Sequence, residues 1–402
     1  MNEVKYKKKN IIKLFLDIYF FAILGFFLFD RIFTITIWHD SYKIANYIWN
    51  KANLFFFGEF MYYVLVCAIA RMLVEKKNLI RILICLIIIV VSYNSYKSSG
   101  EVYIYIVSLL IISAMGVDAK KILLFSIIIE SLILVPTVYA ALKGFIINEI
   151  EIGRNREYLG FIWTTLPVIL FFYIILDWIV IKRGNINLFE LLFFSTINIW
   201  MFIKTDTRMT FLLFCFYITF FFFIKRREKK IANLKILKKT YLFLPWIAFT
   251  FIYILTANYS ENNSLMIKLN KVLSNRLRQC KYSLDLYGIR PFGQSIKWVA
   301  TSNASADNPA TYVDTAYLQS MLLYGWIILV IFLIMYSYLL FKSYEKGLYT
   351  LLFAIIITIV FGLTEQQMLM IQYNTLLLLP FADISNLNKK RRLNYVYTNI
   401  IV

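Results

Sequence analysis

Hydrophobic residues occur in long runs along the whole chain, and short polar segments separate these runs. Most runs are about 15 to 22 residues long, close to the roughly 20 residues that an α-helix needs to cross a bilayer. The pattern predicts twelve membrane-spanning helices, approximately at residues 11–29, 54–74, 79–94, 102–117, 121–142, 161–181, 187–203, 209–224, 241–257, 315–341, 348–364 and 369–382. Several of these helices are short for a bilayer, so we expect neighbouring helices to shield them.

Basic residues fall into alternate polar segments, and this alternation predicts the orientation of the helices. The basic segments are KYKKKN, EKKNLIR, DAKK, IKRGN, KRREKKIANLKILKK, KSYEKG and NKKRR. Because Lys and Arg accumulate in cytoplasmic loops, both termini are expected in the cytoplasm. The opposite, external side then carries one long connection at about 258–313 and five shorter ones. We therefore expect an all-α, multi-pass membrane protein that forms a single domain over residues 1–402, with one large external loop.

Composition supports a membrane protein and narrows its chemistry. The chain is 60% hydrophobic with a mean hydropathy of +0.68, both above the values typical of soluble domains. The net charge of +20 is explained by the cytoplasmic loops, so it does not point to nucleic acid. The single histidine, His39, and four cysteines without paired spacing predict neither a His-based metal site nor a disulfide framework. We expect no metal and no cofactor.

Several arginines lie on the predicted external side, where the positive-inside rule gives them no role. Arg208, in the segment KTDTR, is the clearest case because it begins a predicted helix, where the helix dipole disfavours a cation. Thr205 or Asp206 in the same segment is suited to capping that helix. Such arginines either extend to lipid headgroups or form an anion site. The others on this side are Arg154, Arg156, Arg276, Arg278 and Arg290.

The long external loop contains the segment NSLMIKLNKVLSNRLRQCKY, which predicts an amphipathic helix with Asn263 or Ser264 as its N-cap. Its apolar stripe consists of Leu265, Leu269, Val272 and Leu273. Arg276 falls within this stripe and is expected to point toward the protein or the membrane, whereas Arg278 is expected to point to water. Arg276 either extends to lipid headgroups or has a functional role.

A turn-rich segment, GIRPFGQSIKW, follows and leads into YVDTAYLQSMLLYGW at the start of the tenth predicted helix. Asp314 shares one helical face with Leu318, Met321 and Gly325, and Tyr317 lies on its flank. Asp314 is either a plain N-cap or a carboxylate at the membrane surface that accepts a proton or orients a hydroxyl.

The predicted external segments contain, in order, REYLGF, TDTR, LSNRL, PFGQS and VDTAYLQSMLLYG. This order, with the long loop before the third-last predicted helix, resembles the Wzy family, the polymerases of bacterial O-antigen and capsular polysaccharide repeat units within the O-antigen ligase/polymerase superfamily. The motifs cover about residues 150–326, and the topology covers the whole chain.

The resemblance implies a GT-C-like glycosyltransferase in the bacterial cytoplasmic membrane, with its active site on the external side. It would transfer a growing chain from one undecaprenyl diphosphate carrier to the non-reducing end of a repeat unit on another. The expected reaction inverts the anomeric carbon and needs no metal, nucleotide sugar or other cofactor. The expected partners are the lipid-linked donor and acceptor and membrane lipid, with chain-length regulators and flippases as candidate protein partners and no nucleic acid.

The resemblance also assigns roles to individual residues. Arg156, Arg208 and Arg276 would contact the diphosphate, and Arg208 and Arg276 join Asp314 as the candidate catalytic residues. The related ligases have a histidine where this sequence has Asp314, and His39 does not replace it by motif. Guanidinium groups bind phosphate oxygens in pairs, which suits a diphosphate leaving group. Further candidate substrate-binding residues are Arg154, Arg290, Tyr317 and Gly293.

Three other functions stay open from the sequence. A ligase of the same superfamily would move a finished chain to a different acceptor. A flippase for lipid-linked oligosaccharides would favour broken helices in internally repeated halves, and no such repeat is visible in the sequence. A structural subunit would bind the lipid carrier without chemistry.

Overall fold

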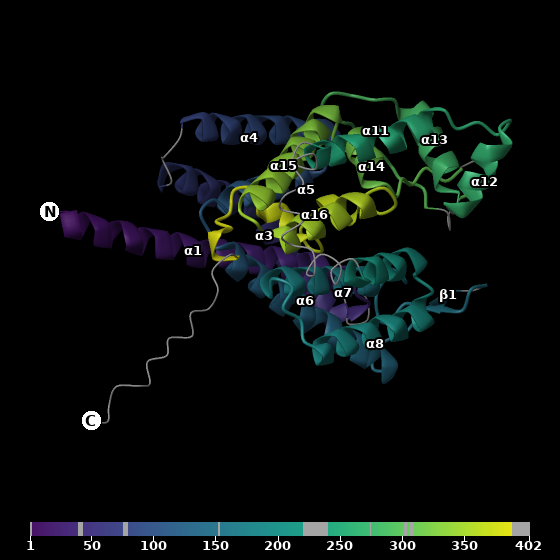
Figure 1. Cartoon of the computed structure of the whole chain (residues 1–402), viewed down its shortest axis with the longest axis horizontal. Helices are drawn as coiled ribbons and strands as arrows, with labels where there is room; N and C mark the ends of the chain where they lie inside the picture. The colour runs from purple at the N-terminus through teal and green to yellow at the C-terminus, as the bar shows by residue number, and fades with distance from the viewer. Residues whose placement is uncertain are drawn as a thin grey trace.

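The computed structural model describes residues 2–38, 43–74, 79–151, 153–219, 240–273, 275–300, 304–305 and 309–387. The chain is predominantly helical, which confirms the predicted all-α fold. Within these ranges, β-strands are limited to a hairpin of β1 (Ile150–Glu151) and β2 (Arg156–Glu157). Figure 1 shows this hairpin together with α12 and α13 at one end of the molecule, opposite the start of α1. We call this the hairpin end.

The described helices occur in the following order along the chain. The first half contains α1 (Asn2–Phe33), α3 (Lys43–Val74), α4 (Leu79–Ser99), α5 (Val102–Ser113) and α6 (Ala119–Leu142). After the hairpin come α7 (Leu166–Ile181), α8 (Leu188–Thr205), a helix at Arg208–Thr219 and α11 (Leu244–Ala257), which η1 (Tyr241–Phe243) precedes. The remainder contains α12 (Ser264–Val272), α13 (Arg276–Tyr287), α14 (Ala316–Leu323), α15 (Trp326–Glu345) and α16 (Tyr349–Phe361).

The helices differ in how much of their surface is buried. In the described part of the chain, five helices are long and apolar enough to cross a membrane: residues 10–33 of α1, and α4, α6, α8 and α15. Large apolar side chains are exposed along several of them, including Phe15, Ile87, Leu132 and Phe193. This exposure suits contact with lipid, where apolar surface costs nothing. By contrast, α7 is buried around almost its whole circumference.

The prediction of a last spanning helix at 369–382 is wrong. The segment forms two short 3₁₀ turns, η3 (Gln366–Leu369) and η4 (Thr375–Leu378), inside the bundle. Side chains bind its backbone there: Asn374 donates to the carbonyl of Met368 over 2.6 Å, and the Tyr103 hydroxyl accepts from the amide of Ile371 over 3.1 Å. Because these side chains supply partners for buried backbone groups, the segment does not need to be helical. The described helices therefore do not include the twelfth predicted span.

Two other predicted helices are each divided in two. The amphipathic helix of the long loop breaks at Asn275, which has a left-handed backbone (φ 68°) and separates α12 from α13. The tenth predicted helix breaks at Gly325 (φ 94°), between α14 and α15. At this second break the turn-rich segment packs closely, since a Cβ on Gly325 would lie 2.2 Å from the carbonyl oxygen of Pro291.

We predict that Gly325→Ala destabilises the protein by about 2 to 4 kcal/mol, because left-handed strain and overpacking against a backbone carbonyl add together. Gly347→Ala is the matched control, since Gly347 has φ 63° but nothing within 4 Å of its Cβ position. The measurement is the thermal unfolding midpoint of each purified variant in the same detergent. Equal midpoints for the two variants would contradict the packing at the Gly325 break.

Candidate functional site

A polar cavity of about 320 Å³ opens at the hairpin end. Segments far apart in the sequence contribute its walls: the hairpin, the turn before α7, α13, the residues before α14 and the residues after α16. The lining residues are Glu151, Arg156, Tyr158, Trp163, Thr164, Thr165, Leu166, Arg276, Gln279, Ala300, Tyr312, Asp314, Glu365, Gln366 and Gln367. Two arginines, three carboxylates, three glutamines and three large aromatic rings therefore meet in one cavity.

Arg276 lies at the centre of the charged part of this cavity. Its Nε is 2.9 Å from Oδ2 of Asp314, and its Nη2 is 2.9 Å from Oε1 of Glu365. Its Nη1 donates to the carbonyl of Thr364. About a quarter of the side chain is exposed, 27%, so these charge-assisted bonds are partly shielded from water and hold the guanidinium in one orientation.

The break at Asn275 explains how Arg276 reaches the cavity. Asn275 turns the chain so that α13 begins at Arg276, and the amide of Arg276 binds the carbonyl of Leu273. Arg278, two residues further, is exposed. The inward direction expected for Arg276 from the apolar stripe therefore agrees with the structure, although a turn between two helices produces it rather than one continuous helix.

The two carboxyls beside Arg276 lie outside the apolar helices, at the start of α14 and beyond the end of α16. Burial raises the pKa of Asp314 above its ordinary value, although the adjacent Arg276 opposes this change. Burial likewise raises the pKa of Glu365, with Arg276 again acting in the opposite direction and Asp314 adding to the increase. Carboxyls with a raised pKa are better proton acceptors near neutral pH than ordinary ones.

Asp314 is not the N-cap of α14. Thr315 occupies that position, and the Asp314 carboxylate is instead paired with Arg276. Of the two roles left open by the sequence, the structure therefore removes capping and leaves the carboxylate directed into the cavity.

Arg156 joins the hairpin to the KTDTR segment. From β2, its Nε donates to the carbonyl of Thr205 over 2.6 Å, and its Nη1 is 3.1 Å from Oε2 of Glu151. A second ion pair, between Lys204 and Glu157 at 2.7 Å, supports the same contact. Thr205 ends α8, so Arg156 also satisfies one of the free carbonyls at that helix end.

Arg208 lies beside this contact but does not line the cavity. Its guanidinium makes two bonds with Asp206, at 3.0 and 3.1 Å, and 77% of its side chain is exposed. Asp206 does not cap the following helix; it ends α8 in a left-handed conformation (φ 46°). The bond from Arg208 lowers the pKa of Asp206, and the more distant charges of Arg156 and Arg154 add to this effect. Arg208, Arg156 and Arg154 thus form a cationic cluster around Asp206.

The other candidate residues lie apart from the cavity wall. Arg154 and Arg290 are exposed, and the carbonyl of Arg290 accepts from the amide of Trp326 over 3.2 Å. Gly293 packs against the end of α14, where a Cβ would meet the carbonyl oxygen of Leu323. Tyr317 is buried, and its hydroxyl donates to the carbonyl of Ile359 over 2.8 Å. The structure thus gives Gly293 and Tyr317 packing roles, and His39 lies outside the described residues.

Glu365 is the main site residue that the sequence analysis missed. It lies just past a predicted spanning helix, in GLTEQQM, where one acidic residue carries no distinctive spacing. Gln366 follows it and accepts from the Gln319 side-chain amide over 2.6 Å. Tyr312 and Trp163 were also missed, because aromatic residues are too common in this chain to stand out.

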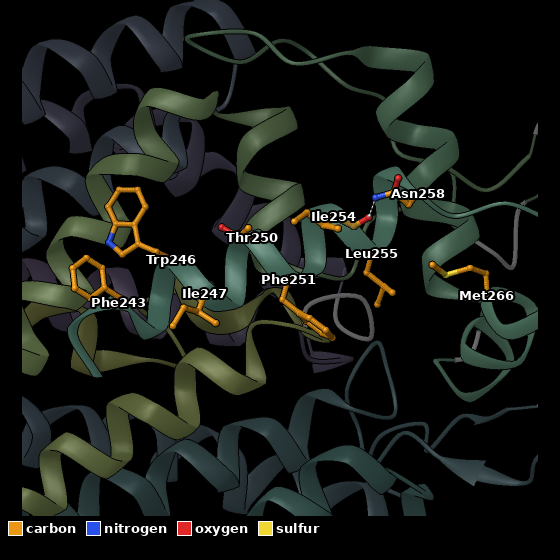
Figure 2. A pocket seen from close by; sticks show the side chains of 9 residues that line it. All are labelled: Phe243, Trp246, Ile247, Thr250, Phe251, Ile254, Leu255, Asn258 and Met266. Carbon is orange, nitrogen blue, oxygen red and sulfur yellow. Dashed lines mark hydrogen bonds between the residues drawn. The ribbon is translucent and has the colours of Figure 1, made fainter. Parts of the chain in front are cut away.

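A second, apolar cavity of about 530 Å³ runs along α11. Figure 2 shows side chains from Phe243 and Trp246 at one end of α11 to Asn258 at the other, with Met266 of α12 beyond it. Its lining is almost entirely apolar. Because α11 packs against α13, this apolar surface lies next to the helix that carries Arg276.

No protein-family model, curated protein or solved structure matches the chain. By its fold and its cavity, the chain is a helical protein with helices apolar enough to cross a membrane. It has a charged cavity with aromatic walls at one end of the bundle.

We predict that the two carboxylates stabilise the fold cooperatively through Arg276. Asp314→Asn or Glu365→Gln alone leaves the guanidinium one carboxylate, whereas the double variant leaves none. The double variant should lose more unfolding free energy than the sum of the single variants, by about 1 kcal/mol or more. Denaturant unfolding of all four proteins in one detergent measures this coupling.

The control is the same cycle with Asp285→Asn in place of Asp314→Asn. Asp285 is exposed and pairs with Lys281 on the surface of α13, so its effect should simply add to that of Glu365→Gln. Additivity in the Asp314 cycle as well would contradict a shared role around Arg276.

Proposed function

We propose that this chain is a membrane glycosyltransferase that polymerises oligosaccharide repeat units carried on undecaprenyl diphosphate. In this proposal the hairpin end faces the outside of a bacterial cytoplasmic membrane, the bundle is GT-C-like, and donor and acceptor are both lipid-linked. The observation that carries the proposal is the position of Arg276 between Asp314 and Glu365 in a polar cavity at the end of an apolar helix bundle.

The contents of the cavity suit a sugar acceptor. Aromatic rings stack on the apolar faces of sugars, and glutamine side chains both donate and accept hydrogen bonds to hydroxyls. Tyr158, Trp163 and Tyr312 supply rings, and Gln279, Gln366 and Gln367 supply amides.

The carboxylates supply the base. In the proposed reaction, Asp314 or Glu365 takes the proton of the acceptor hydroxyl while the hydroxyl oxygen bonds to the anomeric carbon of the donor. The bond from that carbon to the diphosphate oxygen breaks, so its electron pair leaves with undecaprenyl diphosphate and the anomeric carbon inverts. The proton then passes from the carboxyl to water. No covalent sugar–enzyme intermediate and no other reactant are needed.

The arginines supply charge for the leaving group. Negative charge grows on the diphosphate as the bond breaks, and fixed guanidinium groups favour that state over the ground state. Arg276 and Arg156 line the cavity, and Arg154 and Arg208 add positive charge beside it. The cavity lining itself holds three carboxylates against two arginines. Protonation of one carboxyl during turnover would therefore strengthen the attraction for the diphosphate, which couples the base to the leaving group.

The apolar cavity along α11 fits the remaining part of such a substrate. A polyprenyl chain is apolar, and the lining from Phe243 to Met266 offers it a surface next to the helix of Arg276. A charged headgroup site beside an apolar groove is the arrangement that a lipid diphosphate requires.

We predict that the purified protein, supplied with lipid-diphosphate repeat units and a chelator but no nucleotide sugar, produces a ladder of polymer on a gel. An Arg276→Met variant with the same expression level should produce no ladder, because the leaving group loses its main cation. A requirement for a divalent metal, or an Arg276→Met ladder equal to wild type, would contradict the proposal. Transfer to a non-glycan acceptor without a ladder would instead indicate a ligase, and movement of the lipid across vesicles without transfer would indicate a flippase.

The pH dependence of kcat/KM should show which carboxyl, Asp314 or Glu365, is the base. Rate is lost as pH falls through the pKa of the base, and burial raises that pKa for both carboxyls. The acidic limb of kcat/KM should therefore lie above the ordinary carboxyl range of about 4. Replacing the true base, by Asp314→Asn or by Glu365→Gln, should remove this limb and most of kcat, whereas the other replacement should keep the limb. A limb that survives in both variants would exclude both residues as the base.

A further inference from the structure

Two carboxyl side chains lie in the interior of the bundle, well away from the cavity residues already described. Glu130 lies about half-way along α6 and is 0% exposed, and Asp177 lies on α7 and is 1% exposed. α6 and α7 pack against each other along their lengths. Both helices are strongly apolar, so each acid interrupts a buried hydrocarbon surface.

Among the described residues, neither carboxyl forms an ion pair with a side chain of opposite charge. In the described part of the chain, both carboxyl oxygens of Glu130 lack a hydrogen-bond partner, and so does Oδ1 of Asp177. Oδ2 of Asp177 accepts a hydrogen bond from the hydroxyl of Thr375, on η4. Several charged side chains on neighbouring elements form ion pairs of their own: Asp17 with Arg71, Asp30 with Arg31, Glu190 with Lys182, and Lys204 with Glu157.

A third polar group without a partner belongs to the same region. The hydroxyl of Tyr217, on the helix Arg208–Thr219, is buried (2% exposed) and has no hydrogen-bond partner among the described residues. It lies within electrostatic range of Asp177, as Asp177 does of Glu130. Three different helices therefore each bury a polar side chain that has at least one oxygen without a hydrogen-bond partner among the described residues.

The cost of burying charge determines whether these carboxyls bind a proton or another cation. Two ionised carboxylates without cations in an apolar interior cost many kcal/mol, so the pair must hold a cation or a proton. A metal ion takes several oxygen or nitrogen ligands in a shaped cage, and the described residues include no cluster of three or more His, Cys, Asp or Glu side chains. A proton needs no cage and turns a carboxyl into a donor for its neighbour.

Tyr173 lies between Asp177 and the end of α7 that lines the charged cavity. Tyr173 lies one turn before Asp177 on α7, on the side nearer the start of α7, where Leu166 lines the cavity. Its buried hydroxyl has no hydrogen-bond partner among the described residues, and the charges of Asp177 and Glu365 both act on it. Its ring also packs against that of Phe361 at the end of α16, four residues before Glu365.

We propose that Glu130 and Asp177 form a proton-binding site in the interior of the helix bundle, and that the Tyr173 hydroxyl connects this site to Glu365 in the cavity. The site binds a proton as the ligand, which forms an O–H bond on one carboxyl and hydrogen-bonds to the other. This inference does not depend on the glycosyltransferase proposal, because it rests on burial, on unsatisfied oxygens and on the position of Tyr173 on α7.

Infrared spectroscopy of the full chain in lipid nanodiscs tests the site. A protonated carboxylic acid has a carbonyl stretch that shifts in D₂O, and wild type should show this band at neutral pH. The double variant Glu130→Gln/Asp177→Asn should remove most of it, whereas Glu261→Gln, at an exposed residue, should not. The part of the band that Asp314→Asn or Glu365→Gln removes belongs to the carboxyls of the cavity. A spectrum without a band assigned to Glu130 or Asp177 would overturn the site, and so would loss of that band when Na⁺ is added at constant pH.

Carbodiimide labelling tests the same site in the unaltered protein, in case a variant fails to fold. Carbodiimides react with protonated carboxyls in apolar surroundings. An adduct on Glu130 or Asp177, located by mass spectrometry and suppressed at alkaline pH, supports the proposal. Adducts elsewhere on the chain with none at this pair would count against it.

Tyr173→Phe tests the connection. Removing only the hydroxyl should leave the acid band in place but slow its exchange in D₂O several-fold. Tyr139→Phe, at an exposed tyrosine of α6, should leave the exchange rate unchanged. Wild-type exchange in Tyr173→Phe would overturn the route through Tyr173.

Discussion

The ion pairs of Arg276 with Asp314 and Glu365 join three parts of the chain that the sequence keeps far apart. Arg276 begins α13 in the long loop, Asp314 precedes α14, and Glu365 follows α16. A partly buried guanidinium that loses its carboxylates is left as an uncompensated charge, so this contact constrains the long loop, the start of α14 and the end of α16 at once. The cavity exists because these segments are held together.

The sequence predicted what depends on local pattern. Long apolar runs gave the all-α fold and most helix positions, and the place of Arg276 in an apolar stripe gave its inward direction. Breaks within helices were missed, since Asn275 and Gly325 act through backbone conformations that hydropathy does not record. The segment 369–382 was predicted as a helix because a buried irregular segment is as apolar as a spanning helix. Only tertiary partners such as Tyr103 and Tyr336 show the difference.

The candidate site was predicted only in part, because only some of its residues stand out in the sequence. Arginines on the side opposite the basic loops stood out by charge, and two of them, Arg156 and Arg276, line the cavity. Arg208 stood out equally, yet it pairs with Asp206 and does not line the cavity. The sequence could not show this, because order along a chain does not give distance in space. Glu365 and the pair Glu130–Asp177 carry no motif. Their chemistry comes from burial and from what faces them, so only the structure reveals them.

In the proposed function, the cavity around Arg276 receives a diphosphate. The most direct measurement is ³¹P NMR of a lipid diphosphate in nanodiscs, titrated with wild type and with Arg276→Met of equal stability. Wild type should shift and broaden both phosphorus resonances in a saturable way, and Arg276→Met should do so only at much higher concentration. Equal shifts with both proteins would show that the diphosphate binds elsewhere and would rule out this role of Arg276.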